Sequence, residues 1–157
     1  MTDWSTVPKF GVSTGRFPIQ DRPSAYAIIP NAAAQLAVVC TAAGYYLPGG
    51  GIEGEESATT AVLREVAEEC GLTVIATSWR AFATEVVCSE AEGTEFVKRS
   101  TFCEALLVSP QPVGSGEFVL EWQSIEAAGQ VLAPASHRWA VREWAHRQRM
   151  PSDGSVV

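Results

Sequence analysis

The sequence has few charged residues and no long apolar run. Charged residues make up 18% of the 157 residues, below the roughly 25% typical of soluble proteins, and 46% are hydrophobic. This composition disfavours a disordered chain and supports a folded core. The longest apolar-rich stretch, residues 32–43, is interrupted by Gln35 and Thr41 and is too short to span a bilayer. We therefore expect one domain over residues 1–157 that has no membrane partner.

Its four cysteines lack the spacing of a zinc site or a redox pair. They contain no C-x-x-C motif and no histidine cluster accompanies them; they are Cys40, Cys70, Cys88 and Cys103. This pattern predicts free thiols in a reducing compartment. The first ten residues, MTDWSTVPKF, have no basic segment followed by an apolar one, so no signal peptide is expected. We expect a cytoplasmic protein.

Positive charge is also scarce. The chain has 11 basic and 18 acidic residues and a net charge of -7. Binding of duplex nucleic acid through its backbone needs a clustered positive face, so this class of partner is not expected. An anionic small molecule would need local positive charge, which a divalent cation held by acidic side chains supplies.

Turn-forming residues and strand-like segments alternate in the first third of the chain. Residues 1–24 contain three prolines and two glycines, which predicts an arm with at most one short strand near residues 9–14. Such an arm covers a sheet edge or forms a homodimer contact. Residues 25–30 and 36–42 are predicted to be two strands of one hairpin, followed by a short strand at 45–47 and a glycine loop at 49–51.

The period of the apolar residues changes after Gly54. Helical spacing relates Thr59, Leu63, Val66 and Cys70, and Gly71 follows where a left-handed cap belongs, so residues 55–70 are predicted to be a helix. The remaining predicted elements are a long hairpin of strands 72–87 and 96–108, a strand at 118–122, a helix at 125–132 and a helix at 136–150 capped by Ser136.

Three carboxylates share one face of the predicted helix. Glu65, Glu68 and Glu69 are spaced i, i+3 and i+4 and fall within one narrow arc. Such an acidic face is either simply solvated or holds a cation that relieves the repulsion. Oxygen ligands of this kind suit Mg²⁺ or Mn²⁺. Arg64 is placed to pair with Glu68, and the preceding glycines let the backbone approach an ion or a phosphate closely.

The spacing of these residues resembles the complete Nudix box. Gly50 is followed after five residues by Glu56, and after seven more by the run Arg64-Glu65-Val66-Ala67-Glu68-Glu69-Cys70-Gly71-Leu72. No signature position departs from the motif, which covers 23 of the 157 residues, from position 50 to position 72. The order of the surrounding strands is similar to the Nudix α/β/α sandwich. The resemblance implies an α/β fold with a mixed β-sheet and the Nudix loop-helix-loop.

The resemblance also implies an activity and a set of site residues. The activity is Mg²⁺-dependent hydrolysis of a phosphoanhydride bond in a nucleoside triphosphate or a nucleoside diphosphate-X substrate. The implied metal ligands are Glu65, Glu68, Glu69 and the Gly50 carbonyl. Arg64 and Glu56 would hold these acids in place, and either Glu65 or a glutamate from a loop outside the box would be the general base.

Several residues outside the box have both a functional and a structural interpretation. The loop glutamates are Glu90, Glu92 and Glu95, with Glu117 a weaker candidate. Lys98, Arg99, Arg16 and Arg22 are candidates for outlying phosphates or are simply solvated charges. Tyr45, Tyr46, Phe82 and Phe96 are candidates for stacking on a base, although aromatic residues in strands usually belong to the core. The sequence therefore does not identify the substrate.

The sequence leaves two other classes of function open. One is a Nudix-like module that senses a nucleotide without cleaving it, which the intact glutamates disfavour. The other is an isomerase of an isoprenoid diphosphate, for which no supporting cysteine and glutamate motif is found.

Near the C-terminus, Trp139 and Trp144 lie among arginines. We expect both tryptophans to pack on the sheet rather than on a membrane or a partner protein, with the arginines facing solvent.

Overall fold

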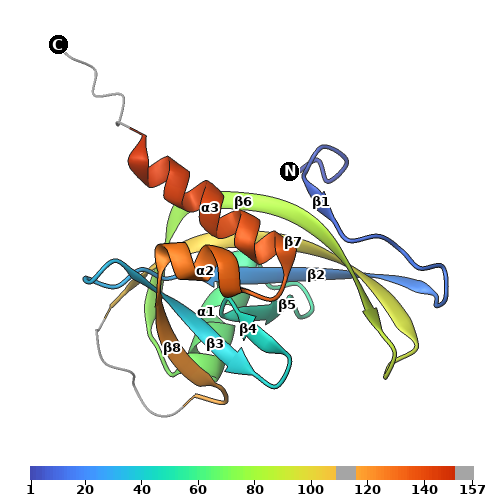
Figure 1. Cartoon of the computed structure of the whole chain (residues 1–157), viewed down its shortest axis with the longest axis horizontal. Coiled ribbons are helices and arrows are strands. Elements are labelled where there is room, and N and C mark those ends of the chain that lie inside the picture. The colour runs from blue at the N-terminus through green and yellow to red at the C-terminus, as the bar shows by residue number, and fades with distance from the viewer. Residues whose placement is uncertain (109–115, 151–157) are drawn as a thin grey trace.

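Two β-sheets and three helices make up the described part of the chain (Figure 1), which in this computed structural model is residues 1–108 and 116–150. Five strands form a mixed sheet in the order β1 (Lys9–Phe10), β6 (Val74–Ser89), β7 (Thr94–Leu107), β2 (Ile19–Ile28) and β5 (Gly49–Gly51). Three form an antiparallel sheet in the order β4 (Gly44–Tyr46), β3 (Gln35–Thr41) and β8 (Val119–Ser124). The helices are α1 (Ala58–Cys70), α2 (Ile125–Val131) and α3 (Ala135–Arg149).

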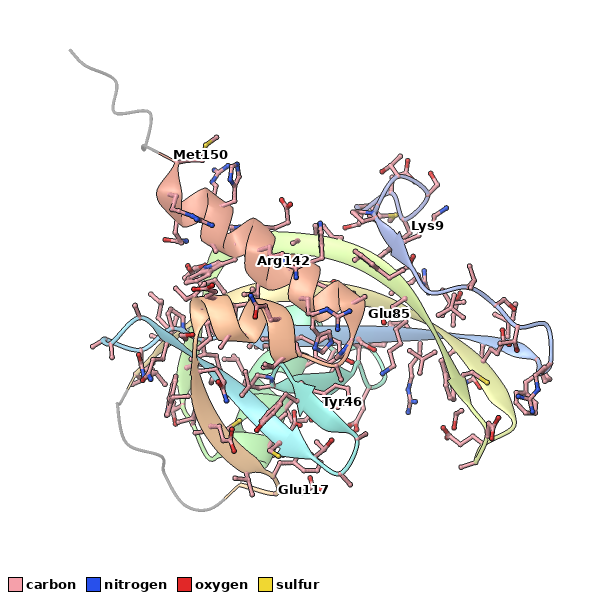
Figure 2. All side chains as sticks on the ribbon, in the orientation of Figure 1. Lys9, Tyr46, Glu85, Glu117, Arg142 and Met150 are labelled. Atoms are coloured by element: carbon pink, nitrogen blue, oxygen red, sulfur yellow. The ribbon has the colours of Figure 1, made fainter. Side chains whose placement is uncertain are left out.

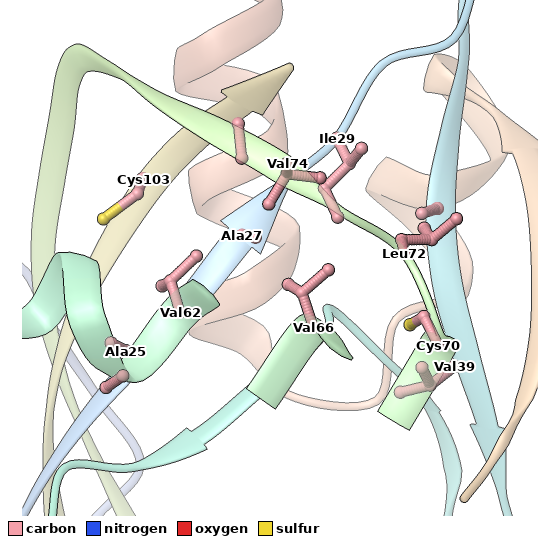
Figure 3. Packing of buried hydrophobic residues seen from close by; sticks show 13 residues of the cluster. Ala25, Ala27, Ile29, Val39, Val62, Val66, Cys70, Leu72, Val74 and Cys103 are labelled. Carbon is pink, nitrogen blue, oxygen red and sulfur yellow. The ribbon is translucent and has the colours of Figure 1, made fainter. Parts of the chain in front are cut away.

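The sheets separate two hydrophobic cores. Because strand side chains alternate between faces, Ala25 and Ala27 of β2 pack with α1, as Figure 3 shows, whereas Tyr26 and Ile28 pack with α2 and α3. Helices therefore cover both faces of the strand layer. The predicted α/β class with a mixed sheet is confirmed.

Both ends of α1 have side-chain or glycine caps. Ser57 Oγ accepts a hydrogen bond from the Thr60 N–H at 3.1 Å, and Gly71 has a left-handed backbone with φ 66°. The C-terminal cap was predicted correctly, but the helix begins at Ala58 rather than Glu55 because Ser57 caps it. Leu63, which helical spacing related to Val66 and Cys70, is 39% exposed, so the expectation that it shares their buried face is wrong. Val62 lies there instead.

The predicted hairpin of β2 and β3 is wrong. The two strands meet only near their turn, where Pro30 and Leu36 form an isolated bridge, and they then enter different sheets. β2 instead pairs in parallel with β7 along its whole length and starts at Ile19. Its Pro23 is tolerated because β5 pairs with β2 only from Ser24 onward. This long-range pairing has no local signal in the sequence.

The glycines predicted as a loop form strand β5, which pairs antiparallel with β2. Close approach explains their composition: a Cβ on Gly49 would collide with the Ala25 carbonyl oxygen and with Tyr26. Gly49 also has a φ of 149°. The glycine segment is thus fixed in the sheet beside α1.

A side chain from β6, and not Ser136, caps α3. The Glu85 carboxylate accepts hydrogen bonds from the Ser136 N–H at 2.9 Å and the Ala135 N–H at 3.3 Å. A carboxylate is favourable at this end of a helix because the helix dipole is positive there. The prediction of Ser136 as the cap is therefore wrong, since a capping group contributed by another strand has no local sequence signal.

The predicted packing of the two tryptophans is confirmed. Trp144 is buried and its indole N–H donates to Glu104, while Trp139 packs against Phe10 and Phe102. The arginines of α3 are not all simply solvated, because Arg142 donates to the Gly129 carbonyl at 2.7 Å.

Within the described residues no helix is long and apolar enough to cross a membrane. No disulfide joins the four cysteines, all of which the structure describes.

Candidate active site

Strand β5 and helix α1 meet at two points. The Gly49 N–H donates to Glu69 Oε1 at 2.7 Å. At the next residue, a Cβ on Gly50 would lie 2.6 Å from Glu65 Oε1, so only glycine leaves room for that carboxylate. The glycine strand thereby holds Glu69 and leaves space for Glu65.

Arg64 organises the acidic cluster. Its Nη2 and Nε contact the two carboxylate oxygens of Glu56 at 2.5 and 3.2 Å. Nη1 contacts Glu65 Oε1 at 3.0 Å and Glu68 Oε2 at 3.4 Å, and Nη2 also donates to the Gly51 carbonyl at 3.2 Å. Hydrogen bonds from Arg64 lower the pKa of Glu56, and those to Glu56 raise the pKa of Arg64. One planar guanidinium thus connects the strand, the turn before α1 and the helix acids.

Glu69 is the buried member of the triplet, with 6% of its surface exposed. Burial, reinforced by the nearby charges of Glu65, Glu117 and Glu68, raises its pKa to about 7, although the Gly49 N–H opposes the shift. A buried acid among like charges is unfavourable unless positive charge is present. The oxygen donors and their charge therefore fit a hard divalent cation.

The three acids are bound to different groups of the protein in this conformation. Among residues 1–108 and 116–150, no three His, Cys, Asp or Glu side chains are gathered at metal-binding distances. The three carboxylates are not gathered because they have different partners: Glu65 and Glu68 contact Arg64, whereas Glu69 is bound to Gly49. The three carboxylates would therefore have to reorient to share an ion.

The structure brings Glu117 to the cluster, although the sequence ranked it below the other loop glutamates. Its N–H donates to the Glu68 carbonyl at 2.8 Å, and the Phe118 N–H donates to the Glu69 carbonyl at 3.1 Å. Gly116 lies so close that a Cβ there would collide with the Glu69 carbonyl. The segment leading into β8 is therefore bound to the last turn of α1, with Glu117 at its exposed tip (Figure 2).

The other loop glutamates do not reach the cluster. Glu90 lies in the turn between β6 and β7 and pairs with Arg16 at 2.9 Å, and Glu92 lies in the same turn. Glu95 is fully buried near this turn, where it accepts hydrogen bonds from Ser13 and from the amide and hydroxyl of Thr14. These bonds lower the pKa of Glu95. Glu95 therefore anchors the N-terminal arm. The sequence gave no sign of this role, because Glu95 follows a polar turn and resembles the other turn glutamates.

A cleft of about 300 Å³ opens beside the glycine strand. Glu69 and Gly49–Gly51 line one end, and Arg22, Tyr46 and Lys98 line the rest together with neighbouring strand residues. A second hollow of about 190 Å³ shares Tyr46 and Lys98 with the first and reaches the start of α3. Because the two hollows share these lining residues, we treat them together and call them the substrate groove.

Only some of the candidate substrate-binding residues line the groove. Lys98 and Arg22 line it, whereas Arg99 lies 3.6 Å from Asp21 and packs on Trp4. Of the aromatic candidates, Tyr46 lines both hollows. Phe82 packs edge-on against Trp4, Phe96 is buried beneath Arg22, and Tyr45 lines neither hollow.

Sequence reasoning missed two groove residues, Glu85 and His137. His137 is 2% exposed, and its Nδ1 accepts a hydrogen bond from the Leu47 N–H at 3.2 Å. Burial lowers the pKa of His137 to about 3, so the ring is neutral. Glu85 is half-buried in β6, as its neighbours are, and the local sequence gives no signal that it lies in the groove.

The model of the Nudix domain family matches residues 21–148. That span contains the box, the groove, α1, α2 and all but the last residue of α3. The chain belongs to the Nudix family. It is accordingly a Nudix pyrophosphohydrolase that acts on small nucleotide-like substrates, and Nudix hydrolases generally use a divalent metal. No curated protein matches the sequence.

Solved structures of low sequence identity share the fold. The solution structure of the Escherichia coli ORF135 protein is 23% identical, with a TM-score of 0.61 over 90% of this chain and 100% of that one. A Caenorhabditis elegans Ap4A hydrolase binary complex is 18% identical, with a TM-score of 0.62 over 81% and 97%. The E. coli dihydroneopterin triphosphate pyrophosphohydrolase is 17% identical, with a TM-score of 0.60 over 80% and 95%. At these identities the likeness shows the fold.

Proposed function

We propose that this Nudix protein hydrolyses a phosphoanhydride bond in a nucleoside triphosphate or a nucleoside diphosphate-X substrate with the help of Mg²⁺. One observation carries the proposal: Arg64 binds Glu65 and Glu68 on one face of α1, and the glycine strand binds Glu69, which lines the substrate groove. Like charges placed so close together repel each other and lower the stability of the fold, so the arrangement needs a functional explanation.

The proposed ligands are Glu65, Glu68, Glu69 and the Gly50 carbonyl, all oxygen donors suited to Mg²⁺, with Mn²⁺ as a substitute. A cation bound there supplies charge that neutralises phosphate oxygens and makes the attacking water more acidic. Arg64 and Glu56 are positioning residues, since they orient the helix acids through hydrogen bonds.

For the general base we propose Glu117. Its carboxylate is exposed and its backbone is bound to Glu68, so it is held beside the triplet without being buried. Glu65, the alternative base, contacts Arg64 and is only 16% exposed in its side chain. Removing a proton from water requires an accessible carboxylate within reach of that water. Glu117→Gln should therefore reduce kcat while leaving KM nearly unchanged.

The test is a substrate panel assayed with Mg²⁺ and with product identification. It should contain nucleoside triphosphates, ADP-ribose, nucleotide sugars and dinucleoside polyphosphates. Ap4A and dihydroneopterin triphosphate belong in it because two proteins of similar fold are named for them. Release of pyrophosphate, or of a nucleoside monophosphate and a phosphorylated X group, supports the proposal. Binding without turnover of any member would favour a nucleotide sensor instead.

A further inference from the structure

A row of charged side chains crosses the floor of the substrate groove. Lys98 on β7 is paired in register with Arg22 on β2 and with Glu85 on β6. Residues paired in register point to the same face of a sheet, so the three side chains form a line of two cations and one carboxylate. All three line the groove.

Glu85 does not form an ion pair with Lys98. Its two oxygens accept hydrogen bonds from the first N–H groups of α3, beside which it lies in Figure 2. Within the described chain, Lys98 has no carboxylate within 4.0 Å. Burial and the neighbouring Arg22 lower the pKa of Lys98, and the charge of Glu85 opposes this shift. Glu85 therefore acts on Lys98 only through space, while its hydrogen bonds go to α3.

Arg22 is also oriented toward the groove. Its guanidinium lies over the ring of Phe96 at 4.6 Å, a contact that restrains a long side chain. Two like charges on adjacent strands repel each other, which is unfavourable for folding unless an anion lies between them. The glycine strand and Glu69 lie in the same cleft, so such an anion would belong to a molecule that also reaches the acidic cluster.

We propose that Arg22 and Lys98 form a phosphate subsite that holds the end of a polyphosphate chain. This inference rests on the proposed function and narrows it: the preferred substrates are nucleoside triphosphates or longer polyphosphates, and not nucleoside diphosphates that carry an uncharged X group. An uncharged sugar in this position would leave both cations without a partner.

Steady-state kinetics of Lys98→Gln and Arg22→Gln test the subsite. Each change should raise KM for a nucleoside triphosphate about tenfold, the value of one charge-assisted hydrogen bond, and leave KM for a nucleotide sugar unchanged. Lys98→Arg should retain the preference because it keeps the charge. Arg99→Gln is the matched control, since Arg99 neighbours Lys98 in the chain but lies outside the groove.

Calorimetric binding of inorganic tripolyphosphate in EDTA provides a readout that does not depend on catalysis. Wild type and Arg99→Gln should bind it equally, and Lys98→Gln about tenfold more weakly. Equal affinity of Lys98→Gln and Arg99→Gln would overturn the inference, as would a KM change of the same size for the triphosphate and the sugar nucleotide. If wild type binds tripolyphosphate through Lys98 but hydrolyses no substrate, the proposed function fails while the subsite stands.

Discussion

Glu56 and Arg64 form a two-point ion pair across the start of the Nudix helix. Both guanidinium nitrogens on one edge of Arg64 contact both oxygens of Glu56, at 2.5 and 3.2 Å. Two parallel contacts fix the plane of the guanidinium as well as its position. Its remaining nitrogen therefore reaches Glu65 and Glu68 in a defined direction.

Arg64→Lys should damage the site while keeping the charge. Lysine cannot make the two-point contact, so the orientation of Glu65 and Glu68 is lost and kcat should fall about tenfold or more. Steady-state kinetics with Mg²⁺ measures the effect. Arg16→Lys is the control because Arg16 forms an exposed ion pair with Glu90, away from the acidic cluster. Equal activity of the two variants would mean that Arg64 does not position the acids.

Gly50→Ala should impair activity much more than Gly51→Ala. A Cβ at Gly50 would displace the Glu65 carboxylate, whereas nothing lies within 4 Å of a Cβ at Gly51. Displacement of a catalytic group by about 1 Å costs on the order of a hundredfold in rate. Comparing kcat of the two variants, with circular dichroism to verify folding, measures the difference. Similar kcat values would refute the close-approach argument.

Removing Mg²⁺ should abolish activity but leave the fold intact. Val62, Val66 and Cys70 pack α1 on the sheet without any metal. Loss of a ligand present at about ten times its Kd costs roughly 1.4 kcal/mol, or a few degrees in Tm for a domain of this size. Thermal unfolding with EDTA and with excess Mg²⁺ gives the comparison. A much larger fall in Tm would show that the metal is structural.

Acid should destabilise the protein through His137. Its pKa is about 3 in the folded chain, because of burial, and about 6.5 when unfolded. Between these values only the unfolded chain binds the proton, so the free energy of unfolding falls as the pH drops below about 6.5. By pH 5 the loss from this group is up to about 2 kcal/mol.

His137→Gln isolates this effect, since glutamine retains an acceptor for the Leu47 N–H but does not titrate. Urea unfolding of both proteins at pH 7 and pH 5 gives the comparison. The variant should be less stable than wild type at pH 7 and should lose less stability on acidification. An identical loss in the two proteins would exclude His137 as the titrating group.

Local patterns predicted local structure well. Gly71 ends α1 because a left-handed cap favours glycine, and this requirement can be recognised from the residue type and its position. The spacing of Gly50, Glu56 and Arg64 identified the family before any contact was known. At the site, the sequence predicted which side chains of the box lie together, because fixed spacing on one helix determines which side chains share a face.

Pairing between distant segments was not predictable in the same way. Nothing near Ser24 indicates that β2 pairs with β7, about 75 residues later, rather than with β3. For the same reason the sequence ranked Glu95 above Glu117, although the first anchors the N-terminal arm and the second lies beside α1. Homodimerisation through residues 1–24, the single domain and the cytoplasmic location stay predictions.

The most direct test of metal-assisted hydrolysis at the glutamate cluster is the Mg²⁺-dependent kcat of Glu69→Gln on the best substrate of the panel. Glutamine keeps the size of the side chain and an oxygen acceptor for the Gly49 N–H but removes the charge. We predict a fall in kcat of on the order of a hundredfold or more, with Glu126→Gln on the exposed face of α2 unaffected. Near-normal kcat in Glu69→Gln would contradict the account.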